Sequence, residues 1–223
     1  MDPWAFGWTQ LLTIIGFVIT GAIAIGGFGT FERWRKQKLE EKKIDAALEA
    51  LAIAYQSKFV FEHIRGPMAY GYEWTDMPQR PGDTEDKRSS RGAYYAPLKR
   101  INQNKEFFEG IWKIQPLVMA LFGPHVENVF LKVHQVRRDI EIAAQMLMEN
   151  VDDRYRGDDA STIELYKQFR VDIYGHGGQY TKEGDRVGTK LKEFQTGMEA
   201  IFRPVVDREY REVKEPTTEN VRS

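Results

Sequence analysis

The chain has 223 residues, with 32 basic and 33 acidic side chains and a formal net charge of −1. It contains no cysteine, which excludes a disulfide scaffold, a thiolate metal site and a cysteine nucleophile. The near-zero net charge gives no support for a nucleic-acid binder, so we expect no nucleic-acid partner. The apolar residues gather at the N-terminus, and this asymmetry is the most informative feature of the sequence.

A long uncharged stretch lies near the N-terminus. No Asp, Glu, Lys or Arg occurs between Asp2 and Glu32. A helix needs about 20 apolar residues to cross about 30 Å of hydrocarbon, so we predict a transmembrane helix over residues 9–31 after a short segment, residues 1–8. A cleaved signal peptide is the alternative. Secretory signals carry a basic n-region, and no lysine or arginine precedes this apolar run.

Basic residues follow the apolar stretch, and none precedes it. The positive-inside rule counts Lys and Arg near the ends of a span and places the more basic side in the cytoplasm. We therefore expect a single-pass protein of the cell membrane (the inner membrane in a bacterium), with the N-terminus outside and the C-terminal domain in the cytoplasm. The candidates for contact with anionic lipid headgroups are Arg33, Arg35, Lys36 and Lys38.

Small residues share one face of the predicted membrane helix. Gly16, Thr20 and Gly27 fall on that face at about 100° per residue. Such rows let a second helix approach closely, although glycine is frequent in membrane helices in any case. Besides the lipid bilayer, we expect a protein partner or self-association through this helix.

Periodic apolar residues after the span predict an all-α fold, with the membrane helix followed by a cytoplasmic bundle of four to five helices. The expected segments are a basic juxtamembrane and amphipathic helix over 32–65, an aromatic and charged loop over 66–96, the helical bundle over 97–204 and a charged tail over 205–223. Three prolines set expected boundaries: Pro97 in the first turn of a helix, Pro116 at a kink or restart and Pro204 at an end. Ser161 is expected to open a helix through a capping box.

No motif indicates catalysis, so we expect no enzyme, no catalytic residues, no cofactor and no metal site. None of the four histidines belongs to an HExxH pattern. The stretch Gly175-His176-Gly177-Gly178 lacks the spacing of a phosphate-binding loop. A helix end with Gly175 in the left-handed conformation explains it better.

A row of polar residues lies along one face of the helix expected after Pro124. His134, Arg138 and Glu141 share one face, which would suit proton transfer or, as we expect, a solvent-exposed surface with an Arg138–Glu141 ion pair. Arg137 lies at the edge of the apolar face, where it would pair with a buried carboxylate or mark a contact surface. Arg137, His134 and Glu141 are therefore candidates for a polar network or partner surface, whereas Trp112 is expected in the core.

Three functions fit these features. The first is a membrane-anchored interaction or scaffolding module at the cytoplasmic face. The second is a sensory or signal-transducing component, in which a continuous helix links the membrane to the bundle. The third is a membrane-tethered enzyme with an active site between helices, against which the lack of a catalytic motif weighs.

Overall fold

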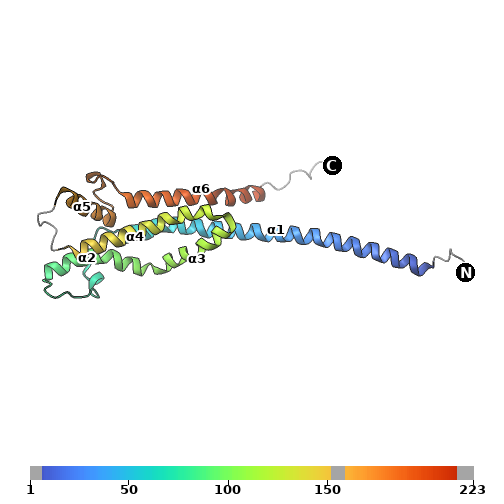
Figure 1. Ribbon diagram of the computed structural model, residues 1–223, viewed down its shortest axis with the longest axis horizontal. Helices are drawn as coiled ribbons and strands as arrows, with labels where there is room; N and C mark the ends of the chain where they lie inside the picture. The colour runs from blue at the N-terminus through green and yellow to red at the C-terminus, as the bar shows by residue number, and fades with distance from the viewer. Residues whose placement is uncertain (1–6, 152–158, 215–223) are drawn as a thin grey trace. The chain divides into compact units, whose positions relative to one another are not determined.

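The computed structural model describes residues 7–151 and 159–214, without the side chains of residues 9, 24–28 and 208–214. Across these residues the fold is all-α and has no strand, as predicted (Figure 1). The α-helices are α1 (Trp8–Ile64), α2 (Glu85–Gln103), α3 (Lys105–Phe122), α4 (Glu127–Glu149), α5 (Ala160–Tyr174) and α6 (Arg186–Lys214). The short 3-10 helices are η1 (Gly71–Trp74), η2 (Pro124–Val126) and η3 (Gly178–Tyr180).

The chain divides into two compact units, Met1–Asp45 and Ala46–Ser223. Helix α1 contributes residues to both units, and its helical hydrogen bonding continues past residue 31 as expected. Among the described residues, no helix combines the length and the apolar character needed to cross a membrane. The predicted span over 9–31 includes residue 9 and residues 24–28, whose side chains lie outside the described part of the chain. The span therefore stays a prediction.

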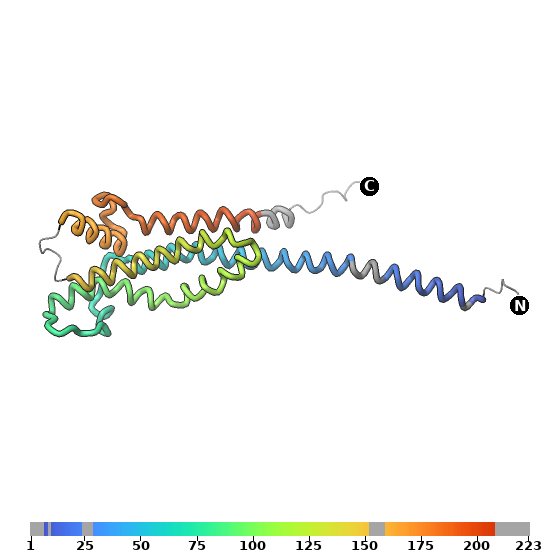
Figure 2. The backbone as a smooth tube through the Cα atoms, in the orientation of Figure 1, coloured from blue at the N-terminus to red at the C-terminus, as the bar shows by residue number. Residues whose placement is uncertain are grey.

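The second unit is a helical bundle built around α4, which packs against α2, α5 and α6. Figure 2 shows α4 and α6 running alongside each other. Helix α4 can fill this place because its apolar residues recur every three or four positions, which gives one continuous buried face. The buried residues of that face include Phe130, Val133, Val136, Ile140, Ala143 and Leu147. Edge-to-face ring contacts of Phe61 with Phe107 and Phe108 join α1 to α3.

Helix α2 begins at Glu85, so the expected loop over 66–96 is wrong in its second half. Thr84 caps the helix, and its side chain accepts a hydrogen bond from the Lys87 backbone N–H. The first half of α2 is rich in charged residues, so its sequence does not show an apolar face that would predict burial. Arg91 is buried because its guanidinium forms an ion pair with Asp83, which a hydrophobic pattern does not reveal.

Pro97 and Pro204 do not lie at the predicted helix ends, whereas a place inside one helix is compatible with the kink expected at Pro116. Pro97, Pro116 and Pro204 are inside α2, α3 and α6, and the break between α2 and α3 falls at Asn104. Proline removes one backbone hydrogen bond and costs about 3 kcal/mol in a helix interior. Buried residues flank Pro97 and Pro116, and Pro204 lies between the buried Phe202 and the partly buried Val205 and Val206; their packing offsets this cost. The expected tail over 205–223 accordingly begins later, because α6 reaches Lys214; residues 215–223 lie outside the described part.

Helix α5 begins two residues earlier than the predicted capping box. Its N-cap is Asp159, whose carboxylate accepts hydrogen bonds from the Thr162 N–H at 2.8 Å and the Ser161 hydroxyl at 2.7 Å. Asp159 is a stronger cap than Ser161 because a carboxylate also interacts favourably with the helix dipole. Gly175 ends the helix in the left-handed conformation, with φ of 69°, and this prediction is confirmed.

Candidate functional site

A group of aromatic and polar side chains lies where α3 and α4 meet at the bundle surface. We call it the Trp112 cluster; its members are Phe108, Trp112 and Gln115 of α3 and His134, Arg137 and Glu141 of α4. Burial of Ile111 and Ile114 in α3, and of Val133 and Val136 in α4, turns these neighbouring positions toward each other at the rim of the core.

The indole of Trp112 stacks on the imidazole of His134, with ring centroids 4.4 Å apart and planes 29° apart. Atom Nε2 of His134 lies 2.9 Å from Oε1 of Gln115. Trp112 is nevertheless 60% exposed, so its expected place in the core is wrong. The stacking holds a large aromatic side chain in one orientation at the surface.

Arg137 and Glu141 form the charged half of the cluster. Nε of Arg137 donates to Oε1 of Glu141 at 2.8 Å, and the guanidinium lies 4.7 Å from the ring centroid of Phe108. The expected Arg138–Glu141 pair is therefore wrong. Arg137 is favoured because it lies on the α3 side of α4, where Phe108 offers a cation–π contact, while Arg138 is exposed.

The environment of His134 favours the neutral imidazole. Burial lowers the pKa of His134 from its ordinary value, and the positive charge of Arg137 lowers it further. At neutral pH the cluster therefore offers a neutral imidazole, an indole and an internally paired arginine. The structure brings together the three residues singled out from the sequence, and it adds Trp112, Gln115 and Phe108. Their helical spacing gave no sign that these residues meet α4.

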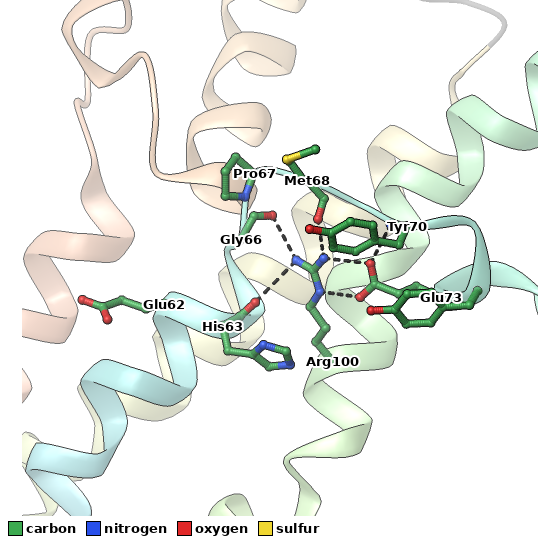
Figure 3. Close-up of a pocket in the computed structure, with 9 residues that line it drawn as sticks. Glu62, His63, Gly66, Pro67, Met68, Tyr70, Glu73 and Arg100 are labelled. Atoms are coloured by element: carbon green, nitrogen blue, oxygen red, sulfur yellow. Dashed lines mark hydrogen bonds and ion pairs between the residues drawn. The ribbon is translucent and has the colours of Figure 1, made fainter.

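A second candidate is a pocket of about 290 Å³ between the end of α1, the linker that follows it and η1 (Figure 3). Arg100 of α2 lies at its centre. Nε of Arg100 donates to Oε1 of Glu73 at 2.6 Å, and Nη2 donates to Oε2 at 2.8 Å. Tyr70 and Tyr72 line the pocket with stacked rings, 5.7 Å apart and 7° from parallel.

The remaining donors of Arg100 are taken up by backbone carbonyl groups. Nη1 donates to the oxygen of Gly66 at 2.9 Å, and Nη2 donates to that of Met68 at 2.5 Å. Nη1 also reaches the His63 carbonyl oxygen, in the last turn of α1, at 3.4 Å. Because every guanidinium nitrogen already has an acceptor, Arg100 has little capacity left for an anionic ligand. The pair holds the linker against α1 and α2, which is a structural role.

The Glu73 carboxylate is kept ionised by this arrangement. The hydrogen bond from Arg100 lowers the pKa of Glu73, and the hydrogen bond from the Tyr70 backbone N–H acts in the same direction against the effect of burial. Neither Arg100 nor Glu73 was predicted as a site residue, and the two are 27 positions apart in the sequence. Their spacing in the sequence does not indicate that Glu73, in an expected loop, contacts Arg100, in the following helix.

The residues predicted to act at the membrane belong to the first unit. The Thr20 hydroxyl donates to the Gly16 carbonyl oxygen at 2.8 Å, and a Cβ added at Gly16 would meet nothing within 4 Å. Gly27 belongs to residues 24–28, whose side chains lie outside the described part. Lys38 forms an exposed ion pair with Glu41 at 2.6 Å, and Arg33, Arg35 and Lys36 are exposed.

Within the segments that the structure describes, no three carboxylate or imidazole side chains are grouped so that they could hold a metal ion. The geometry therefore offers two candidates of different character: a fixed aromatic and polar surface at Trp112, and a pocket whose central arginine serves the fold. No family model, curated protein or solved structure matches this chain, so any functional assignment must come from these residues themselves.

Proposed function

We propose that this chain is a single-pass membrane protein whose helical bundle binds a protein partner at the cytoplasmic face of the membrane. The observation that carries the anchor is the exposure of large apolar side chains in the first unit. Large apolar side chains of α1 that are each 43–75% exposed include Leu11, Leu12, Ile14, Ile15, Phe17, Val18, Ile19 and Ile23.

These side chains point to all sides of α1 because they occupy almost consecutive positions. A helix of a water-exposed protein has one apolar stripe, whereas a helix that is apolar all round is surrounded by apolar material. Lipid supplies such surroundings, and helical hydrogen bonds satisfy the backbone there. The basic residues after residue 31 then favour a cytoplasmic position for the bundle and are available to anionic headgroups.

The Trp112 cluster supports the second half of the proposal. Tryptophan and arginine are enriched among the residues that dominate binding energy at protein interfaces. Trp112 is exposed, and its stacking on His134 already restricts its motion. Less conformational entropy is then lost when a partner covers the ring. The paired Arg137 and Glu141 beside it provide a polar rim.

Recovery of a partner from native membranes tests this proposal. The full chain is solubilised in mild detergent and purified, and the Trp112→Ala variant is compared with the wild type. The matched control is Tyr180→Ala, which removes another exposed ring, from η3. A hot-spot residue contributes at least about 2 kcal/mol, or roughly thirty-fold in affinity. We expect a stoichiometric partner with the wild type and the control, and strongly reduced recovery with Trp112→Ala. Equal recovery with all three proteins would contradict the assignment of this surface.

A sensory role is the second candidate, and the unbroken helix from Trp8 to Ile64 favours it. A continuous helix can transmit a rotation or a shift in packing. One alanine inserted after Leu39 rotates the helix on its two sides by about 100°. A sensor should show altered partner binding after this insertion, whereas a simple anchor should bind its partner as before.

A further inference from the structure

His134 joins the exposed ring of Trp112 to the rest of the bundle. Its imidazole stacks on the indole at a centroid distance of 4.4 Å, and its Nε2 lies 2.9 Å from Oε1 of Gln115. The amide nitrogen of Gln115 faces the Met119 sulfur at 3.9 Å, which leaves the amide oxygen for His134. Because an amide oxygen only accepts hydrogen bonds, Nε2 carries the proton of the neutral ring, and a second proton would add at Nδ1.

We infer that neutral His134 holds Trp112 in its fixed orientation and that protonation of His134 releases the indole ring. The surface formed by the Trp112 cluster is then complete at neutral pH and lost in acid. Regulation of partner binding by this change rests on the proposed function, because it concerns the same surface. The coupling between the two side chains needs no partner, so it can be tested even if no partner binds there.

The direct contacts of His134 offer no negative charge to an added proton. From α3 it meets Trp112 and Gln115, which are uncharged. On its own helix the nearest charge is that of Arg137, and the Glu141 carboxylate already accepts a hydrogen bond from Arg137. A protonated ring in this place would be partly buried beside a second cation and would gain no ion-pair partner.

The other charged groups around this part of α4 point elsewhere or are exposed to water. Two ion pairs join α4 to α6 at positions about 140–160° around the helix from His134: Lys132–Glu193 and Asp139–Lys190. Helices α2 and α5 pack further along α4, at Ala144 and Leu147. Exposed titratable or charged residues on the neighbouring turns of α3, η2 and α4 are Glu109, Lys113, His125, Glu127 and Arg138. Within the Trp112 cluster, His134 is therefore the group that titrates between about pH 5 and about pH 8.

The direction of the change follows from the proton affinity of each arrangement. In the stack, burial lowers the pKa of His134 from its ordinary value of about 6.5, and Arg137 lowers it further. A ring turned out into water binds a proton more readily, so acid shifts the population toward that arrangement. The stack is complete above about pH 6.5 and is lost as the pH falls through the lowered pKa. Attraction between a charged imidazole and the indole face opposes this change, but Trp112 is 60% exposed and water weakens the attraction.

Magnetic resonance of the full chain in detergent tests the coupling of the two rings. The chain is labelled with 5-fluorotryptophan, and the signal of Trp112 among the five tryptophans is the one missing from Trp112→Phe. The four histidine signals are followed in the same pH series, and that of His134 is the one missing from His134→Gln. We expect the Trp112 signal to shift with the same midpoint as His134, below about pH 6.5. In His134→Gln this shift should be at least five-fold smaller.

Two matched variants test the cause of the shift. Arg137→Gln removes the neighbouring positive charge and should move both midpoints up toward about pH 6.5. Lys113→Gln removes an exposed charge next to Trp112 in the sequence and should leave both midpoints unchanged. A Trp112 signal that stays fixed while His134 titrates overturns the inference, because the charged ring then keeps the stack. A Trp112 shift that persists in His134→Gln overturns it as well.

Recovery of the partner at about pH 7.5 and at about pH 5 tests the regulation of the surface. Recovery with the wild type should fall at least five-fold in acid, whereas recovery with His134→Gln should be the same at both pH values. An equal fall with both proteins places the sensitivity to acid outside His134 and overturns the regulation. Absence of a partner at either pH overturns the proposed function, and the magnetic resonance titration then still decides whether His134 controls Trp112.

Discussion

Arg100 and Glu73 form a doubly hydrogen-bonded ion pair in which each side chain is only 5% exposed. The pair joins α2 to η1, and the remaining Arg100 donors satisfy carbonyl groups at the end of α1 and in the linker. One side chain thus fixes three segments of the bundle. Its removal should affect the fold more than the removal of any exposed charge.

We expect Arg100→Ala to lower the free energy of unfolding by about 3–5 kcal/mol, because it leaves Glu73 as an uncompensated buried charge. The control is Lys99→Ala, which removes the neighbouring lysine and its more exposed pair with Asp76. That change should have little effect. Unfolding of the full chain in detergent, followed by circular dichroism, measures both. Similar stabilities of the two variants would show that the buried pair does not hold the linker.

The same pair predicts a dependence on acid. The lowered pKa of Glu73 in the folded protein means that its stabilising effect is complete above the unfolded pKa of about 4.3 and is lost as the pH falls through the folded pKa. Stability of the wild type should therefore decline below about pH 4.3 more steeply than that of Glu73→Gln, which cannot titrate. Melting temperatures at a series of pH values give both slopes, and parallel slopes would refute the assignment.

Gly92 of α2 lies directly under the indole of Trp74. A Cβ added at Gly92 would overlap Cδ2 and Cγ of that ring, whereas a Cβ at Gly110 of α3 would meet nothing within 4 Å. Alanine is favoured over glycine in a helix by about 1 kcal/mol. We expect Gly110→Ala to stabilise the protein by up to that amount and Gly92→Ala to destabilise it by about 1–3 kcal/mol, because the overlap must be relieved. Stabilisation by both substitutions, in denaturant titrations, would contradict the packing of Trp74.

Arg137 should matter more than Arg138 for stability. It combines an ion pair with Glu141 and a cation–π contact with Phe108, which together contribute about 1 kcal/mol. Arg138 is exposed on the next position of α4. Arg137→Ala should therefore lower the melting temperature by several degrees and Arg138→Ala by much less. Equal melting temperatures of Arg137→Ala and Arg138→Ala would contradict this prediction.

Helix existence could be predicted from apolar periodicity, but the boundaries of α2, α3 and α6 could not. The buried face of α4 follows a clean spacing, so its span was predictable. Helix α2 was half missed because its buried face includes Arg91 and Arg100, which are buried only through Asp83 and Glu73. The continuity of α3 and α6 through Pro116 and Pro204 depends on tertiary packing, which a local rule for proline does not contain.

The candidate surface was predictable in part for a similar reason. The position of Arg137, His134 and Glu141 along one helix follows from helical geometry alone. Their partners Trp112, Gln115 and Phe108 come from another helix, and contacts between helices are not encoded in the spacing of either one. The choice of Arg137 over Arg138 for Glu141 follows from that second helix.

The proposed function places the membrane anchor in the N-terminal part of α1 and the bundle in the cytoplasm. Labelling of single cysteines by a membrane-impermeant maleimide in intact cells tests it most directly, because the natural chain contributes no cysteine of its own. We expect Asp2→Cys to be labelled in intact cells, and Ser223→Cys to be labelled only after the membrane is permeabilised. Labelling of Ser223→Cys in intact cells, with Asp2→Cys protected, would contradict the orientation and with it a partner at the cytoplasmic face.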